Sequence, residues 1–234
     1  MADEKRSDMD DPTAPLAVLF DVDETLVHTG GSGARSWNAA FEKLYGLAAD
    51  IGKHSSAGET DPQVARATFT AVVGHDPSAD ELGKLYGQYL LHLADDILTS
   101  EQYRVLPGAE QTLVALGEAG VTLGLVSGAM EGAARTKLVP ANLNRYFIFG
   151  SYGSDSPDRA ELVRHAIRKA SLLHDRLTPA RVYVVGDTPH DIESAKAAGA
   201  ISVGVASGHY STDELEAAGA DHVMASLDAA FPGI

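Results

Sequence analysis

Asp21 and Asp23 follow the apolar run Leu16–Phe20 near the start of the chain. Residues i and i+2 of a strand share a face, so both carboxylates can point into one crevice at the strand's carboxyl end. Like charges held close repel, and a cation such as Mg²⁺ or a shared proton relieves the repulsion. The pair therefore predicts metal-assisted phosphoryl chemistry, with Asp21 as the nucleophile and Asp23 as the general acid and base.

Two further positions suit a phosphate group. Ser127 and Gly128 follow the apolar run 121–126, and a hydroxyl with backbone N–H groups at a helix N-terminus can bind phosphate oxygens. Arg159 follows the run 146–149, and a cation there can stabilise the charge of the nucleophile and of the phosphoryl group. Other basic residues in a helical context compete for this role: Arg164, Arg168 and Lys169.

An acidic motif follows the run Arg181–Val185. Gly186 permits close backbone approach, and Asp187 comes directly after it. A carboxylate is a preferred Mg²⁺ ligand, so Asp187 is predicted to join the metal site. Asp191 could orient a metal-bound water or favour the N-terminus of the following helix, and both interpretations stay open.

These positions need a scaffold that brings strand ends together. Apolar runs alternate with helix-like stretches, which predicts an α/β fold whose parallel strands present ligands at their carboxyl edge. The predicted strands are 16–20, 121–126, 146–149, 181–185, 200–205 and 221–224. Residues 29–103 break the alternation with helical patterns only, over 36–45, 61–73 and 79–98. They predict a helical insertion above the carboxyl edge, placed to act as a lid.

Composition narrows the classes of function. The net charge of −15 argues against nucleic acid or an anionic membrane as a partner. The chain has no cysteine, which excludes disulfides and thiolate zinc sites and fits a cytoplasmic location. Residues 1–14 have mixed charge and no apolar signal region, which predicts a flexible leader. No run is long enough to span a membrane.

Together, these residues resemble the haloacid dehalogenase-like hydrolase superfamily. Asp21-Val-Asp-Glu-Thr-Leu is similar to its nucleophile motif, Ser127 to its phosphate-binding hydroxyl, Arg159 to its basic position, and Gly186-Asp-Thr-Pro-His-Asp to its acidic motif. The resemblance implies a Rossmann-like core and a Mg²⁺ cofactor held by Asp21, the backbone carbonyl of Asp23, and Asp187. Arg159 stands where a Lys followed by Pro is more usual.

The insertion resembles the helical cap of the branch that contains phosphoglycolate phosphatases and β-phosphoglucomutases. The predicted domains are the core, residues 15–28 and 104–234, and the cap, residues 29–103. Within the cap, Thr60 and Asp61 lie in a segment similar to a cap loop of some phosphatases in this branch. We expect them to contact substrate.

The leading hypothesis is a Mg²⁺-dependent phosphatase that acts on a small monoester, such as phosphoglycolate or a sugar phosphate, through an aspartyl-phosphate. A β-phosphoglucomutase-like phosphotransferase shares the first step and differs in whether the cap admits water or a sugar hydroxyl. A non-catalytic binding protein is a third alternative, although such a protein would be expected to lose an acid. The sequence leaves monomer and homodimer open.

Overall fold

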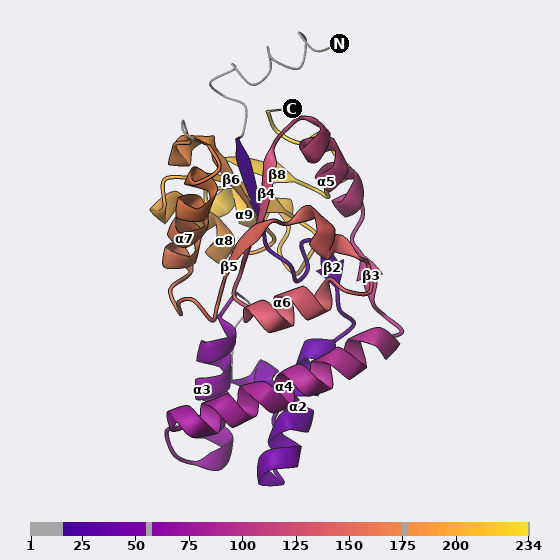
Figure 1. The fold of residues 1–234 in the computed structure, drawn as a ribbon, viewed down its shortest axis with the longest axis vertical. Helices are drawn as coiled ribbons and strands as arrows, with labels where there is room; N and C mark the ends of the chain where they lie inside the picture. Colours follow the sequence, from indigo (N-terminus) through magenta and orange to yellow (C-terminus); the bar gives the residue numbers. More distant parts are fainter. Residues whose placement is uncertain (1–15, 55–57, 175–176, 234) are drawn as a thin grey trace.

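A parallel sheet forms the centre of the computed structural model, which describes residues 16–54, 58–174 and 177–233 (Figure 1). Within these residues, six strands pair in the order β5-β4-β1-β6-β7-β8. Their bounds are β1 Ala17–Phe20, β4 Thr122–Ser127, β5 Phe149–Tyr152, β6 Val182–Gly186, β7 Ile201–Val205 and β8 His222–Met224. The predicted α/β class with a Rossmann-like sheet is confirmed.

Strand β1 is buried on both faces, which explains why its sequence shows no alternation of apolar and polar residues. Ala17 and Leu19 pack on the side of α7 and α8, whereas Val18 and Phe20 face the opposite side, which α5 covers. The helices around the sheet are α5 Ala109–Glu118, α6 Glu131–Lys137, α7 Arg159–Ser171, α8 Pro189–Ala197 and α9 Thr212–Ala217. Short 3-10 helices are η2 Leu143–Tyr146 and η3 Pro179–Arg181.

Between β1 and β4 the chain forms a group of helices that we call the helical insert, residues 29–103. Its helices are α2 Ser32–Tyr45, α3 Asp61–Val73 and α4 Ala79–Thr99, with the 3-10 helix η1 Ile51–Lys53. Trp37 of α2 stacks on Tyr89 of α4 with ring centroids 4.0 Å apart. Figure 1 shows the helical insert at the end of the sheet where β1 ends.

Two features join the helical insert to the sheet. The short strands β2 Val27–His28 and β3 Arg104–Val105 pair antiparallel where the chain leaves and returns. Helix α6 lies between the sheet and α4 (Figure 1), and its residues Ala133 and Ala134 belong to one apolar core that includes both Phe20 and Tyr89. The core is therefore continuous from the sheet to the helical insert.

The local signals predict the helices better than one of the strands. The helix expected over 61–73 has both predicted bounds, because a capping box of Thr60 and Gln63 fixes its start. The strand expected over 146–149 is wrong, since Tyr146 ends η2 and β5 is Phe149–Tyr152. Strand β5 reads FGSY, so its glycine and serine hide the apolar pattern of a buried strand.

Among the helices of the described residues, none combines the length and the apolar character that a membrane span requires. The leader predicted for residues 1–14 lies outside the described residues.

A test of the helical insert compares two leucines of α4. We expect Leu85→Ala to lower the free energy of unfolding by about 2 to 5 kcal/mol, because Leu85 is fully buried. Leu91→Ala is the matched control on the same helix and should change it by less than about 0.5 kcal/mol, because Leu91 is 63% exposed. Urea unfolding followed by fluorescence of the single tryptophan, Trp37, reports on the helical insert directly. Equal effects of the two variants would contradict the packing.

Candidate active site

Three polar side chains lie at the carboxyl ends of neighbouring strands. Asp21 follows β1, Ser127 ends β4 and Asp187 follows β6, and all three are buried. The Asp21 N–H donates to the Val185 carbonyl at 2.9 Å, so the pairing of β1 with β6 continues to the acid and fixes its backbone. The sheet thus brings together residues that lie at least 60 positions apart in the sequence.

A cluster of acids forms at this edge. Asp21, Asp187 and Asp191 each offer a carboxylate oxygen within 4.8 Å of the others. Burial, together with Asp191 and Asp23, raises the pKa of Asp21 to about 7, although Arg159 partly offsets their effect. Burial, with Asp191 and Asp21, raises the pKa of Asp187 to about 8. Two acids with raised pKa values at one point indicate that the negative charge of the site is only partly compensated.

Asp191 is already engaged with protein donors. Its carboxylate accepts the Thr188 N–H at 3.1 Å and the Thr188 hydroxyl at 2.6 Å, and it also accepts a hydrogen bond from Arg159. Thr188 is the N-cap of α8, so these bonds complete a capping box at the start of that helix. Of the two interpretations that the sequence leaves open for Asp191, the one at the helix N-terminus has direct contacts.

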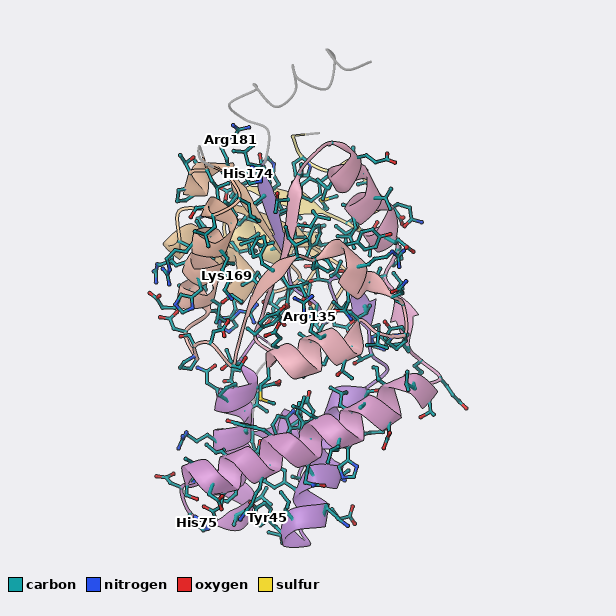
Figure 2. All side chains as sticks on the ribbon, in the orientation of Figure 1. Tyr45, His75, Arg135, Lys169, His174 and Arg181 are labelled. Carbon is teal, nitrogen blue, oxygen red and sulfur yellow. The ribbon has the colours of Figure 1, made fainter. Side chains whose placement is uncertain are left out.

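Arg159 is the basic residue that the fold brings to the acids. Its Nη2 lies 3.9 Å from the Asp21 carboxylate, and its guanidinium also pairs with Asp191 and donates to the Gly58 carbonyl at 3.2 Å. The competing basic residues lie elsewhere on α7. Arg164 pairs with Glu161, Arg168 is exposed, and Lys169 donates to the Gly150 carbonyl beside the sheet (Figure 2).

Asp23 has a partner that the sequence analysis did not identify. The Nζ of Lys137, at the end of α6, lies 2.6 Å from Asp23 Oδ2. Burial alone lowers the pKa of Lys137, but Asp23, Tyr89 and Asp61 outweigh this effect and raise the pKa above its ordinary value, so the ammonium stays charged. The site therefore contains two buried cations, Arg159 beside Asp21 and Lys137 beside Asp23.

A sequence signal for Lys137 does exist. The apolar face of α6 follows the helical spacing of Met130, Ala133 and Ala134, and Lys137 occupies the next position of the same face. A lysine on the apolar face of a short helix is either buried with a partner or misplaced. The position of Lys137 on this face therefore predicts that the lysine is buried. It does not predict the contact with Asp23, because Asp23 is far away in the sequence.

The loop after β4 passes close to Arg159 and to the helical insert. A Cβ added at Gly128 would lie 2.8 Å from Arg159 Nη1 and 2.9 Å from the Glu59 carbonyl oxygen, so any side chain at this position would collide. The Ser127 hydroxyl accepts the Ala129 N–H at 3.3 Å. The fold thus places Ser127, Gly128 and Arg159 in one small region, and their binding of phosphate stays a prediction.

Thr60 and Asp61 also reach this loop. Asp61 donates its N–H to the Gly128 carbonyl at 2.8 Å, and its Oδ2 accepts the Met130 N–H at 2.8 Å. Burial raises the pKa of Asp61 to about 6, although Lys137 partly offsets the effect. Thr60 is buried and caps α3. Both residues therefore lie where the helical insert meets the loop, and their contact with substrate stays a prediction.

The residues at the strand ends fit a hard divalent cation. Oδ1 of Asp21 is buried and has no hydrogen-bond partner within the described residues, so it is free to bind a ligand. Asp187 supplies a second carboxylate on the neighbouring strand, and carboxylate oxygens are the donors that hard cations prefer. A cation there would offset the repulsion that raises both pKa values.

The chain is similar to known phosphatases over most of its length. It is 33% identical over 215 residues to the phosphoglycolate phosphatase of Rhodospirillum rubrum. The aligned region covers 88% of this chain and 85% of that protein. A crystal structure described as a predicted phosphoglycolate phosphatase from Haemophilus somnus matches with a TM-score of 0.71 and 20% identity, over 92% of this chain and 95% of the other.

A second solved structure, of CbbY from Rhodobacter sphaeroides in complex with phosphate, has a TM-score of 0.71 and 20% identity, with 92% of this chain and 95% of that chain covered. At this level of identity, both structures show a shared fold. The family model for haloacid dehalogenase-like hydrolases matches residues 15–199, which contain all the acids and basic residues described above. The chain belongs to the haloacid dehalogenase-like hydrolases.

Proposed function

We propose that this protein is a Mg²⁺-dependent phosphatase that hydrolyses a small phosphate monoester through an aspartyl-phosphate on Asp21. The observation that carries the proposal is the convergence of the buried Asp21, Asp187 and Asp191 carboxylates with the Arg159 guanidinium. Carboxylates that repel one another at one buried point are costly unless they bind a cation or do chemistry.

The two aspartates after β1 divide the chemistry between them. Asp21 attacks phosphorus, the bond from phosphorus to the leaving oxygen breaks, and Asp23 gives that oxygen a proton. Water then attacks the phosphorus of the aspartyl-phosphate and gives its proton to Asp23, which releases phosphate and restores Asp21. Asp21 is buried, whereas Asp23 is partly exposed.

The remaining residues would bind the cation and the phosphoryl group. Carboxylates of Asp21 and Asp187 and the backbone carbonyl of Asp23 would hold Mg²⁺, which when bound neutralises charge on the phosphoryl group. Arg159, the Ser127 hydroxyl and the backbone N–H of Gly128 would bind phosphoryl oxygens. Asp191 keeps Arg159 in place beside Asp21.

The helical insert and the relatives support a small substrate. The insert meets the loop after β4 through Asp61, so it lies over the residues that would bind the phosphoryl group. The Rhodospirillum rubrum relative is named a phosphoglycolate phosphatase. Phosphoglycolate and small sugar phosphates are therefore the substrates to test first.

Replacement of the nucleophile tests the mechanism. We expect Asp21→Asn to lower kcat at least about a thousandfold, because an amide cannot form the aspartyl-phosphate. Phosphate release is measured over a panel that contains phosphoglycolate and sugar phosphates, with Mg²⁺ or EDTA present. Asp213→Asn, at an exposed acid of α9, is the matched control and should keep full activity.

The same panel separates the alternatives. Free phosphate as the product of a sugar 1-phosphate supports hydrolysis, whereas a sugar 6-phosphate would identify a phosphotransferase. Retained turnover in Asp21→Asn would refute the mechanism, and a wild-type protein silent on the whole panel would favour a binding function.

The role of Arg159 can be tested against Arg164, a second arginine on the same helix, α7. We expect Arg159→Met to lower kcat/KM about a hundredfold or more and Arg159→Lys to recover part of the loss, because a cation beside Asp21 stabilises the transferring group. Arg164→Met should change kcat/KM less than about twofold, because Arg164 pairs with Glu161 away from the acids. Circular dichroism and thermal unfolding confirm that each variant folds. Equal losses at both positions would contradict the role of Arg159.

The raised pKa values predict how metal removal changes stability. Between the ordinary value of 3.8 and the folded values of about 7 for Asp21 and about 8 for Asp187, the folded protein binds more protons than the unfolded chain. In EDTA, the free energy of unfolding should therefore fall as pH rises through this window. Saturating Mg²⁺ should make the free energy of unfolding depend less steeply on pH. In EDTA, Asp187→Asn should also reduce this dependence, because it removes one of the two acids. Urea unfolding at several pH values measures the slopes, and identical slopes with and without Mg²⁺ would contradict the site.

A further inference from the structure

Lys137 joins α6 to the proposed acid and base, Asp23. It is 6% exposed, and its Nζ lies 2.6 Å from Asp23 Oδ2. The lysine is held from both ends, because the Tyr103 hydroxyl donates to the Lys137 carbonyl at 3.0 Å while the apolar face of α6 packs in the core. A buried ammonium on a fixed helix is a rigid anchor for a carboxylate.

Asp23 needs such an anchor more than its neighbours do. Its side chain is 40% exposed, and among the described residues its carboxylate has Lys137 as its hydrogen-bond partner. Its backbone is held by a bridge to Val27 in the turn after β1, but this bridge does not restrict the side-chain rotamer. Asp61, the other acid near Lys137, already accepts the Met130 N–H. The orientation of the Asp23 carboxylate therefore depends on Lys137.

We propose that Lys137 is a positioning residue that holds the Asp23 carboxylate in the orientation for both proton transfers. The proposal rests on the proposed phosphatase function. Lys137 forms no bond to the phosphoryl group in either step. The proton passes from Asp23 to the leaving oxygen in the first step and from water to Asp23 in the second. Without Lys137, the carboxylate can rotate toward solvent, and both transfers slow.

The two steps depend differently on Asp23 when the leaving group is a good one. p-Nitrophenolate leaves phosphorus without a proton, so formation of the aspartyl-phosphate from p-nitrophenyl phosphate does not need the acid. Hydrolysis of the aspartyl-phosphate still needs the base. A simple loss of folding would lower both steps together, so this substrate separates a positioning role from a structural one.

The experiment compares Lys137→Met with Lys137→Arg and with the matched control Lys196→Met, whose exposed lysine donates to the Gly219 carbonyl from the last turn of α8. With p-nitrophenyl phosphate and Mg²⁺ in stopped flow, we expect Lys137→Met to keep a fast burst of p-nitrophenolate. Its steady-state kcat should fall about a hundredfold and KM should fall with it, so that kcat/KM, which reports formation of the aspartyl-phosphate, changes less than about threefold. Acid quenching should recover the phosphorylated protein. Lys137→Arg should recover part of the loss, and Lys196→Met should match the wild type.

Three results would overturn the proposal: wild-type turnover in Lys137→Met, an equal fall of burst and steady state, or a crystal structure of Lys137→Met with the Asp23 carboxylate unmoved. If Lys137→Met does not fold, Lys137→Arg decides, because a shifted guanidinium should give the same separation of burst and steady state on a smaller scale. A wild-type protein that is silent on every ester refutes the proposed function instead, and the position of Asp23 in the variant crystal structure still decides the role of Lys137.

Discussion

Repulsion among buried carboxylates at the end of the sheet is the constraint on which the rest of the site depends. Asp21, Asp187 and Asp191 come within 4.8 Å of one another, and burial weakens the screening that water would supply. The fold offsets part of this cost with Arg159 and with the donors of Thr188. Burial, with the repulsion that remains, raises the pKa values of Asp21 and Asp187, so a bound cation would stabilise the site.

Close packing of the backbone makes this arrangement possible. A Cβ at Gly186 would lie 2.2 Å from Cγ of Asp191, and one at Gly208 would lie 1.9 Å from Oδ2 of Asp187. Glycine at these positions lets two acids approach the main chain without a steric collision. The same crowding limits how far the carboxylates can move apart, so charge and not rearrangement must relieve their repulsion.

Lys137 links the proposed acid and base, Asp23, to the packing between the sheet and the helical insert. Lys137 belongs to α6, the helix whose Ala133 and Ala134 lie in the core shared by the sheet and the helical insert. Asp61, at the start of α3, bonds to the loop after β4 and contributes to the field around Lys137. The position of the helical insert and the environment of Asp23 are therefore set by one group of contacts.

The sequence by itself determined the strand-end acids, because Asp21, Asp23 and Asp187 follow apolar runs whose parallel pairing places their ends at one edge. It also determined the starts of α3 and α4, whose capping boxes are local signals. It misplaced β5, whose residues Gly150 and Ser151 carry no apolar pattern. The sequence also favoured Arg159 as the basic residue, but only the tertiary structure placed it beside Asp21 and paired Lys137 with Asp23, because both contacts join residues distant in the chain.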